Sequence, residues 1–146
     1  CKNACSEADI FIACAAVADY RPKSIAQQKL KKTGEDGLTL MLEQNPDIVA
    51  TIASEYQHLL CVGFAAETEN LLEHARAKRV KKRLNVIIAN DVAAQRVFGS
   101  DTNSVTIISE YSELAIPSTT KLEIARQSMA EIARLANSTS SKAKGT

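Results

Sequence analysis

Three short apolar runs recur along the chain, and each has the length and the β-branched content of a buried strand. They occupy residues 9–15, 59–65 and 86–89. Between them lie two stretches with apolar side chains at helical spacing, one from residue 46 to about 56 and one from about 69 to 84. Strands that alternate with helices predict an α/β fold with a mostly parallel sheet flanked by helices.

Turn-rich segments predict further structure between the first two runs. Residues 29–32 and 38–42 flank a spacer at 33–37 that contains two glycines, a pattern typical of a β-hairpin. Arg21-Pro22 is expected to break regular structure before it. Asn45-Pro46 is a helix-start signal, because Asn caps helices well and Pro suits the first helical position.

The last third of the chain predicts a strand and a helix. Residues 104–109 alternate in the manner of a strand, and a final amphipathic helix is expected to be capped within 117–120 and to continue to Leu135. The segment from 137 to 146 is rich in Ser and Lys, which predicts a disordered tail after one domain over residues 1–136.

Composition narrows the possible partners. The net charge of +1 and the absence of Trp give neither a strong field nor a supply of stacking platforms for nucleic acid. No apolar run approaches the roughly 20 residues of a membrane span, and nothing resembles a signal peptide. We therefore expect no nucleic acid and no membrane among the partners.

The cysteines predict a reducing, cytoplasmic location. None forms a Cys-x-x-Cys pair, and neither His58 nor His74 stands at a familiar zinc spacing from them. Two of them lie within apolar runs, where a thiol usually behaves as a small hydrophobe. All four are interpreted as structural: Cys1, Cys5, Cys14 and Cys61.

The end of the first apolar run is a candidate ligand site. In open parallel sheets, ligands bind beyond the carboxyl ends of strands. Small residues there let a ligand approach the backbone, and Asp19 adds a carboxylate; a plain loop carboxylate paired with Arg21 is the alternative. The helix start at residues 45–48 can bind an anion or a base edge through its N–H groups, or can be a simple cap.

Lysines provide the second kind of candidate. Lys29, Lys31 and Lys32 could neutralise phosphates, or could be the solvated edge of a hairpin. In the basic run 76–83, Lys78 and Lys82 stack one turn apart and could hold a triphosphate or track nucleic-acid phosphates. A solvated helix face explains the same run.

No nucleophile can be assembled from these residues. The chain shows neither a Ser/His/Asp nor a Cys/His arrangement, and it lacks a Walker-type loop. Without Gly-x-Gly-x-x-Gly, a dinucleotide-dependent oxidoreductase is a poor reading. The candidate residues are instead suited to binding a ligand and to neutralising its phosphate charge.

Taken in series, six short motifs resemble the bacterial phosphopantothenoylcysteine synthetase domain, the second half of the bifunctional coenzyme A biosynthesis flavoprotein. Their order and spacing cover about residues 9–135. The matching segments are residues 15–20 (AAVADY), 29–32 (KLKK), 45–48 (NPDI), 63–68 (GFAAET), 77–82 (AKRVKK) and 89–91 (AND).

The resemblance implies a Rossmann-like fold with a small β-hairpin flap and a Mg²⁺-dependent ligase. In that family, CTP activates the carboxylate of 4′-phosphopantothenate as an acyl-cytidylate with release of diphosphate. The amine of cysteine then displaces CMP and forms the amide of 4′-phosphopantothenoylcysteine. Because the reacting groups belong to the substrates, the protein mainly binds, orients and neutralises.

The resemblance also implies roles for single residues. Lys29 matches the catalytic flap lysine, which stabilises charge as the acyl-cytidylate forms. Matches to the nucleotide-binding positions include the backbone of the first strand end and two lysines of the basic run. The set comprises Ala13, Cys14, Ala15, Asp19, Lys29, Asn45, Pro46, Asp47, Ile48, Phe64, Lys78 and Lys82.

The chain departs from the family at its front. The family's Gly-rich βα unit is missing, and so is the FMN-containing decarboxylase half, so we expect this piece alone to be inactive. The parent is expected to carry both activities and to be a homodimer. A non-catalytic nucleic-acid-binding α/β module that uses helix 76–83 is the alternative, and a steep salt dependence of binding would support it.

Overall fold

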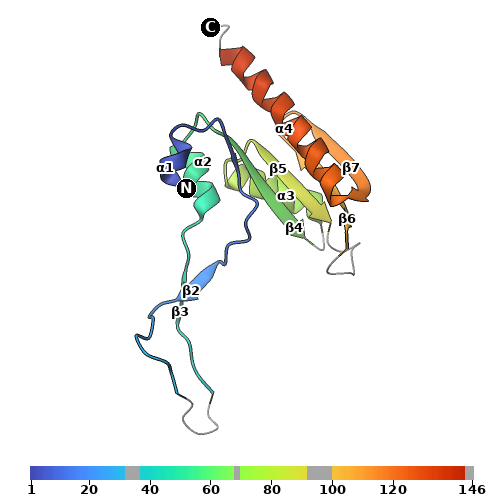
Figure 1. Ribbon diagram of the computed structural model, residues 1–146. Coiled ribbons are helices and arrows are strands. Elements are labelled where there is room, and N and C mark those ends of the chain that lie inside the picture. Colours follow the sequence, from blue (N-terminus) through green and yellow to red (C-terminus); the bar gives the residue numbers. More distant parts are fainter. Residues whose placement is uncertain (32–36, 68–69, 92–99, 144–146) are drawn as a thin grey trace. The chain divides into compact units, whose positions relative to one another are not determined.

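The computed structural model describes residues 1–31, 37–67, 70–91 and 100–143 (Figure 1). The chain forms two compact units, one made of Cys1–Cys14 with Val49–Thr146 and a smaller one made of Ala15–Ile48. Each unit has a sheet of its own.

The larger unit is built on a five-stranded sheet in the order β1-β4-β5-β6-β7. β1 (Ile10–Ile12), β4 (Leu60–Glu67) and β5 (Val86–Asp91) are parallel, whereas β6 (Thr102–Ile108) and β7 (Glu113–Thr120) add two antiparallel strands beside β5. The three apolar runs therefore form the parallel part of the sheet as predicted, and the α/β class with a Rossmann-like, mostly parallel sheet is confirmed.

Helices cover both faces of this sheet. Ile52 and Ala75 join one buried cluster on the face of α2 and α3, and Ile124 and Ile132 join a second cluster under α4. Figure 1 shows α4 lying along β6 and β7. The helices are α1 (Lys2–Cys5), α2 (Ile48–Glu55), α3 (Leu71–Lys81) and α4 (Lys121–Ala143).

The C-terminal region differs from the sequence prediction in two respects. The segment 117–120 belongs to β7, a strand that the pattern did not predict. Proline is tolerated in a strand only where that strand has a free edge, so Pro117 is not a signal for a strand in the sequence alone. Thr120 is nevertheless the cap, since its Oγ1 accepts the Glu123 N–H at 3.2 Å. α4 then continues through 137–143, within the predicted tail, because polar residues can extend a helix that is already formed.

The smaller unit contains a two-stranded antiparallel sheet, which confirms a hairpin but corrects its position. β2 (Tyr20–Pro22) pairs with β3 (Leu42–Gln44), with Arg21 directly opposite Glu43. The segments 29–31 and 38–41 are not strands, and Arg21-Pro22 extends a strand instead of breaking structure. Local turn signals could not reveal that Arg21 and Glu43 pair across the two strands.

Candidate functional site

The carboxyl edge of the parallel strands is stepped. β1 ends at Ile12, which pairs with Val62, whereas β4 continues to Glu67. The Ala13 N–H donates to the Val62 carbonyl at 2.9 Å, and the chain then turns, with the N–H of Cys14 on the Ile12 carbonyl at 3.2 Å. Past this point, no strand in the described part of the chain pairs with that side of β4.

Phe64 faces this step with its main chain. Successive residues of a strand direct their N–H and C=O groups to opposite edges. The Leu60 N–H donates to the Asp9 carbonyl at 3.0 Å and the Val62 carbonyl accepts from Ala13, so the main-chain groups of Phe64 point the same way. The step thus offers a donor and an acceptor that can hold the polar edge of a ligand.

Cys14 lies at this edge and is exposed, which corrects its interpretation as a buried structural thiol. Strand β1 ends three residues earlier than the apolar run suggested, so the Cys14 side chain leaves the sheet. Cys61, by contrast, is buried, and burial raises the pKa of its thiol, with a smaller contribution from Cys5. In the described part of the chain all four cysteines are free.

Lys78 and Lys82 lie at the end of α3, one turn apart. Arg83 follows in the left-handed region with φ of 55°, and the N–H of Leu84 donates to the Arg79 carbonyl at 2.9 Å, which fixes this helix end. α3 packs on the face that Cys61 and Ala65 share, whereas the Phe64 ring lies on the other face. α3 therefore lies on the opposite face of the sheet from the Phe64 ring.

Two other cations of the basic run have structural partners. Arg76 forms two hydrogen bonds with Glu113 at 2.6 and 2.8 Å, and Arg79 donates to the Leu84 carbonyl at 3.3 Å. The hydrogen bonds with Glu113 raise the pKa of Arg76 and lower that of Glu113. These contacts fasten α3 to β7 and secure its end, which weakens the interpretation of the whole run as a nucleic-acid surface.

In the smaller unit, Asn45 joins two candidate segments. Its N–H donates to the Asp19 carbonyl at 2.8 Å, and its Nδ2 donates to the Ala18 carbonyl at 2.7 Å. The prediction that Asn45 caps the helix is wrong, because its side chain is committed to this turn and α2 begins only at Ile48. Asp47 occupies the position directly before the helix instead.

Asp19 and Lys29 are exposed in the smaller unit. Neither side chain makes a hydrogen bond or an ion pair with a described residue, so Arg21 is not the partner of Asp19. Arg21 pairs with Glu43 instead, at 2.7 Å. Lys31 is also exposed, and Lys32 lies outside the described residues.

The candidate residues are thus divided between the two units. The larger unit holds Ala13, Cys14, Phe64, Lys78 and Lys82, and the smaller unit holds Ala15, Asp19, Lys29, Asn45, Pro46, Asp47 and Ile48. The structure brings together Ala13, Cys14 and Phe64 in the first unit, and Asp19 and Asn45 in the second.

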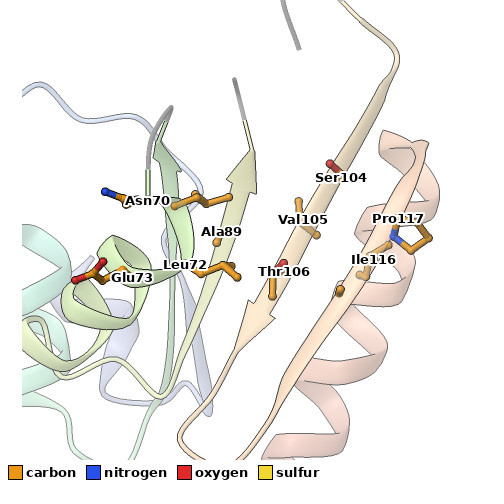
Figure 2. Close-up of a pocket in the computed structure, with 11 residues that line it drawn as sticks. Asn70, Leu72, Glu73, Ala89, Ser104, Val105, Thr106, Ile116 and Pro117 are labelled. Carbon is orange, nitrogen blue, oxygen red and sulfur yellow. The ribbon is translucent and has the colours of Figure 1, made fainter. Parts of the chain in front are cut away.

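A hollow of about 620 Å³ lies elsewhere on the larger unit, between the first turn of α3 and strands β5 to β7 (Figure 2). Leu72 and Glu73 of α3 and Thr106 of β6 are among the residues that line it. The hollow could not be predicted from the sequence, because its lining comes from four separate elements. None of the candidate nucleotide-binding residues lines it.

Two kinds of feature are absent from the described residues. These residues include no cluster of three or more side chains suited to a metal ion. None of the helices among them combines the length and the apolar character needed to cross a bilayer.

Comparison with known proteins identifies relatives. The family model described as "DNA/pantothenate metabolism flavoprotein C-terminal domain" matches residues 1–135. The coenzyme A biosynthesis bifunctional protein CoaBC of Vibrio vulnificus (strain YJ016) is 43% identical over 133 residues, which are 89% of this chain and 33% of that protein. CoaBC of Escherichia coli (strain K12) is 46% identical over 113 residues, or 75% of this chain and 28% of that protein. The chain spans about a third of the length of such relatives.

Solved structures share the fold. The crystal structure of the C-terminal domain of CoaBC aligns with a TM-score of 0.74 at 31% identity, covering 94% of this chain and 59% of that chain. A Cab2 mutant in complex with phosphopantothenate-cysteine aligns with a TM-score of 0.70 at 18% identity, covering 92% of this chain and 46% of that chain. At that identity the second likeness concerns the fold alone.

Proposed function

The chain belongs to the family described as the DNA/pantothenate metabolism flavoprotein C-terminal domain, and on that premise we propose that it is part of a phosphopantothenate–cysteine ligase of coenzyme A biosynthesis. The proposed reaction consumes CTP, 4′-phosphopantothenate and cysteine. It yields 4′-phosphopantothenoylcysteine, CMP and diphosphate. The parent protein, by the same proposal, is a homodimer that also carries the FMN-dependent decarboxylase.

The stepped edge beside β4 is the observation that carries this proposal. A strand end where main-chain N–H and C=O groups are left open suits the hydrogen-bonding edge of a nucleotide base. Phe64 provides such groups, and Ala13 and Cys14 border the same step. These are three of the positions that match the family's nucleotide contacts.

In the proposed first step, a carboxylate oxygen of 4′-phosphopantothenate attacks the α-phosphorus of CTP, and diphosphate leaves. Lys29 stabilises the charge that accumulates on the phosphoryl oxygens, and Lys78 and Lys82 neutralise the phosphate chain. Magnesium, when it accompanies CTP, would supply further neutralisation of the triphosphate.

In the proposed second step, the amine nitrogen of cysteine attacks the acyl carbon. The bond from that carbon to the cytidylate oxygen breaks, CMP leaves, and the amine loses a proton as the amide forms. No protein nucleophile is required, and the chain accordingly acts by positioning and by charge.

Thermal unfolding with nucleotide tests this proposal. We expect CTP–Mg²⁺ to raise the midpoint of unfolding of the chain more than ATP–Mg²⁺ does, since a ligand that binds only the folded state stabilises it. Lys78→Ala/Lys82→Ala should reduce the shift. Lys81→Ala/Lys121→Ala, which removes the same charge from exposed positions, should retain it.

The same measurement on the full-length protein that contains this chain gives the decisive comparison. If CTP–Mg²⁺ produces no shift there, or a shift that ATP–Mg²⁺ reproduces, the proposed CTP-dependent function is wrong.

A further inference from the structure

The turn at Ala18 and Asp19 and the segment at Pro46, just before α2, are tied together by one residue. Asn45 donates its N–H to the Asp19 carbonyl at 2.8 Å and its Nδ2 to the Ala18 carbonyl at 2.7 Å. Asp19 and Pro46 belong to the two nucleotide-binding segments of the smaller unit. Asn45 therefore sets where one segment lies relative to the other.

Arg21 holds Asn45 in this orientation. Its Nη1 donates to Oδ1 of Asn45 at 3.0 Å, and its Nε and Nη2 meet Oε1 of Glu43 at 2.8 and 2.7 Å. With Oδ1 occupied by a guanidinium, the amide group of Asn45 is oriented so that Nδ2 faces Ala18. The guanidinium is planar and rigid, which makes it suited to fixing two acceptors at once.

Burial in the smaller unit points to the same group. Every described residue of 15–48 is exposed except Glu43 and Asn45, which are half-buried. The large apolar side chains of the unit, such as Leu30 and Leu38, lie in solvent. The smaller unit thus has a polar network where a core would otherwise determine its shape.

We propose that Arg21 is a positioning residue for nucleotide, which acts through Asn45 and is not itself in contact with the ligand. It holds the Asp19 turn against the segment at Pro46 that precedes α2, so that both segments meet the nucleotide together. The inference rests on the proposed CTP site and adds a residue, and a role for Asn45, that the motif match does not include.

The test compares three variants of the chain: Arg21→Ala, Arg21→Lys and the control Lys23→Ala. Lys23 is an exposed cation two residues further along, so its removal changes the charge equally but leaves the network intact. The readouts are the Kd for CTP–Mg²⁺ by calorimetry, the exchange rate of the Asn45 amide by NMR, and the midpoint of thermal unfolding.

We expect Arg21→Ala to weaken CTP binding about tenfold, in line with a lost charge-assisted hydrogen bond. The amide hydrogen of Asn45 should exchange with solvent faster than in the wild type, while the midpoint of thermal unfolding stays unchanged. Arg21→Lys should recover only part of the affinity, because an ammonium cannot hold two acceptors in one plane. Lys23→Ala should match the wild type in all three readouts.

Equal Kd values for Arg21→Ala and the wild type would overturn the inference and leave the proposed CTP site intact. Equal weakening by Arg21→Ala and Lys23→Ala would also overturn it, because the effect would then be one of charge alone. If the wild-type chain and its full-length parent both fail to bind CTP–Mg²⁺, the proposed function itself is wrong and the inference falls with it.

Discussion

The two units of this chain obtain their structure in different ways. The larger unit buries apolar side chains on both faces of a sheet, with Ile87 and Ile132 almost fully excluded from water. The smaller unit exposes its apolar side chains, and three side chains, Arg21, Glu43 and Asn45, organise it through hydrogen bonds. Burial stabilises the first strongly, whereas the exposed polar contacts of the second determine local shape with little effect on global stability.

That contrast assigns different tasks to the two units. The larger unit provides a fixed edge at which main-chain groups of β4 are left open. The smaller unit, which has no core of its own in its described residues, presents Asp19 and Lys29 on a two-stranded arm. A two-stranded hairpin is marginally stable by itself, so its polar network has a large influence on where those side chains lie.

The largest expected effect is a difference in the free energy of unfolding between two isoleucine variants. Ile87→Ala removes a side chain with 0% exposure and should lower the free energy of unfolding by about 3–4 kcal/mol, because a cavity remains. Ile25→Ala removes a side chain that is 89% exposed and should change it by less than about 0.5 kcal/mol. Urea unfolding measures both. Similar losses at the two sites would contradict the distinction between the units.

Two glycines give a second matched pair. A Cβ at Gly63 would lie 2.6 Å from Cδ1 of Leu84, which is buried, so Gly63→Ala should cost about 1–3 kcal/mol through overpacking. A Cβ at Gly37 would meet nothing within 4 Å, so Gly37→Ala should leave the midpoint of urea unfolding unchanged. Tolerance of Gly63→Ala would show that Leu84 can repack freely.

Ser128 tests whether a buried hydroxyl in the core of the larger unit lowers the stability of the fold. Its Oγ is buried on α4 and has no hydrogen-bond partner among the residues that the structure describes. Ser128→Ala should therefore stabilise the chain by roughly 1 kcal/mol, since an unsatisfied hydroxyl is removed and helix propensity improves. Ser24→Ala in the smaller unit is the control. A loss of stability in Ser128→Ala would mean that the hydroxyl has a partner, such as a buried water.

The smallest effect concerns the ion pair between α3 and β7. The hydrogen bonds from Arg76 lower the pKa of Glu113, so the pair stabilises the fold above the ordinary pKa of a glutamate, about 4.3. That contribution is lost as the pH falls through this value and then through the lowered pKa of the folded state.

Glu113→Gln should therefore destabilise the chain more at pH 7 than at pH 3, and added salt should shrink the difference. Thermal unfolding as a function of pH measures this. Glu110→Gln, which removes an exposed carboxylate from the preceding turn, is the control. Identical pH profiles for the two variants would show that the pair contributes nothing.

The sequence alone predicted the parallel part of the sheet and its helices correctly. Runs such as 59–65 and 86–89 are continuous and β-branched, and such runs are buried in almost any sheet that contains them. The motifs were assigned to strand ends and helix starts from the positions of these predicted strands and helices. For this reason the family resemblance, the α/β class and the three runs that form the parallel strands were available before any coordinates.

Where prediction failed, the deciding partner was distant in the sequence. β7 was missed because Pro117 argues against a strand unless that strand lies at an edge, and only the assembled sheet has edges. Asn45 was assigned as a helix cap on local grounds, whereas its amide bonds Ala18 and is oriented by Arg21. Cys14 was assigned to the interior because the apolar run continues past the point where β1 ends.

The sequence by itself determined which segments are buried and in what order they enter the sheet, because burial depends on the periodicity of side chains along the chain. Tertiary structure decided where strands end, which hydrogen-bonding groups stay open and which polar side chains meet. Those outcomes depend on pairs such as Val62 with Ala13 and Arg21 with Glu43, whose contact energies exist only after the chain has folded. The candidate site of this protein lies among the features of the second kind.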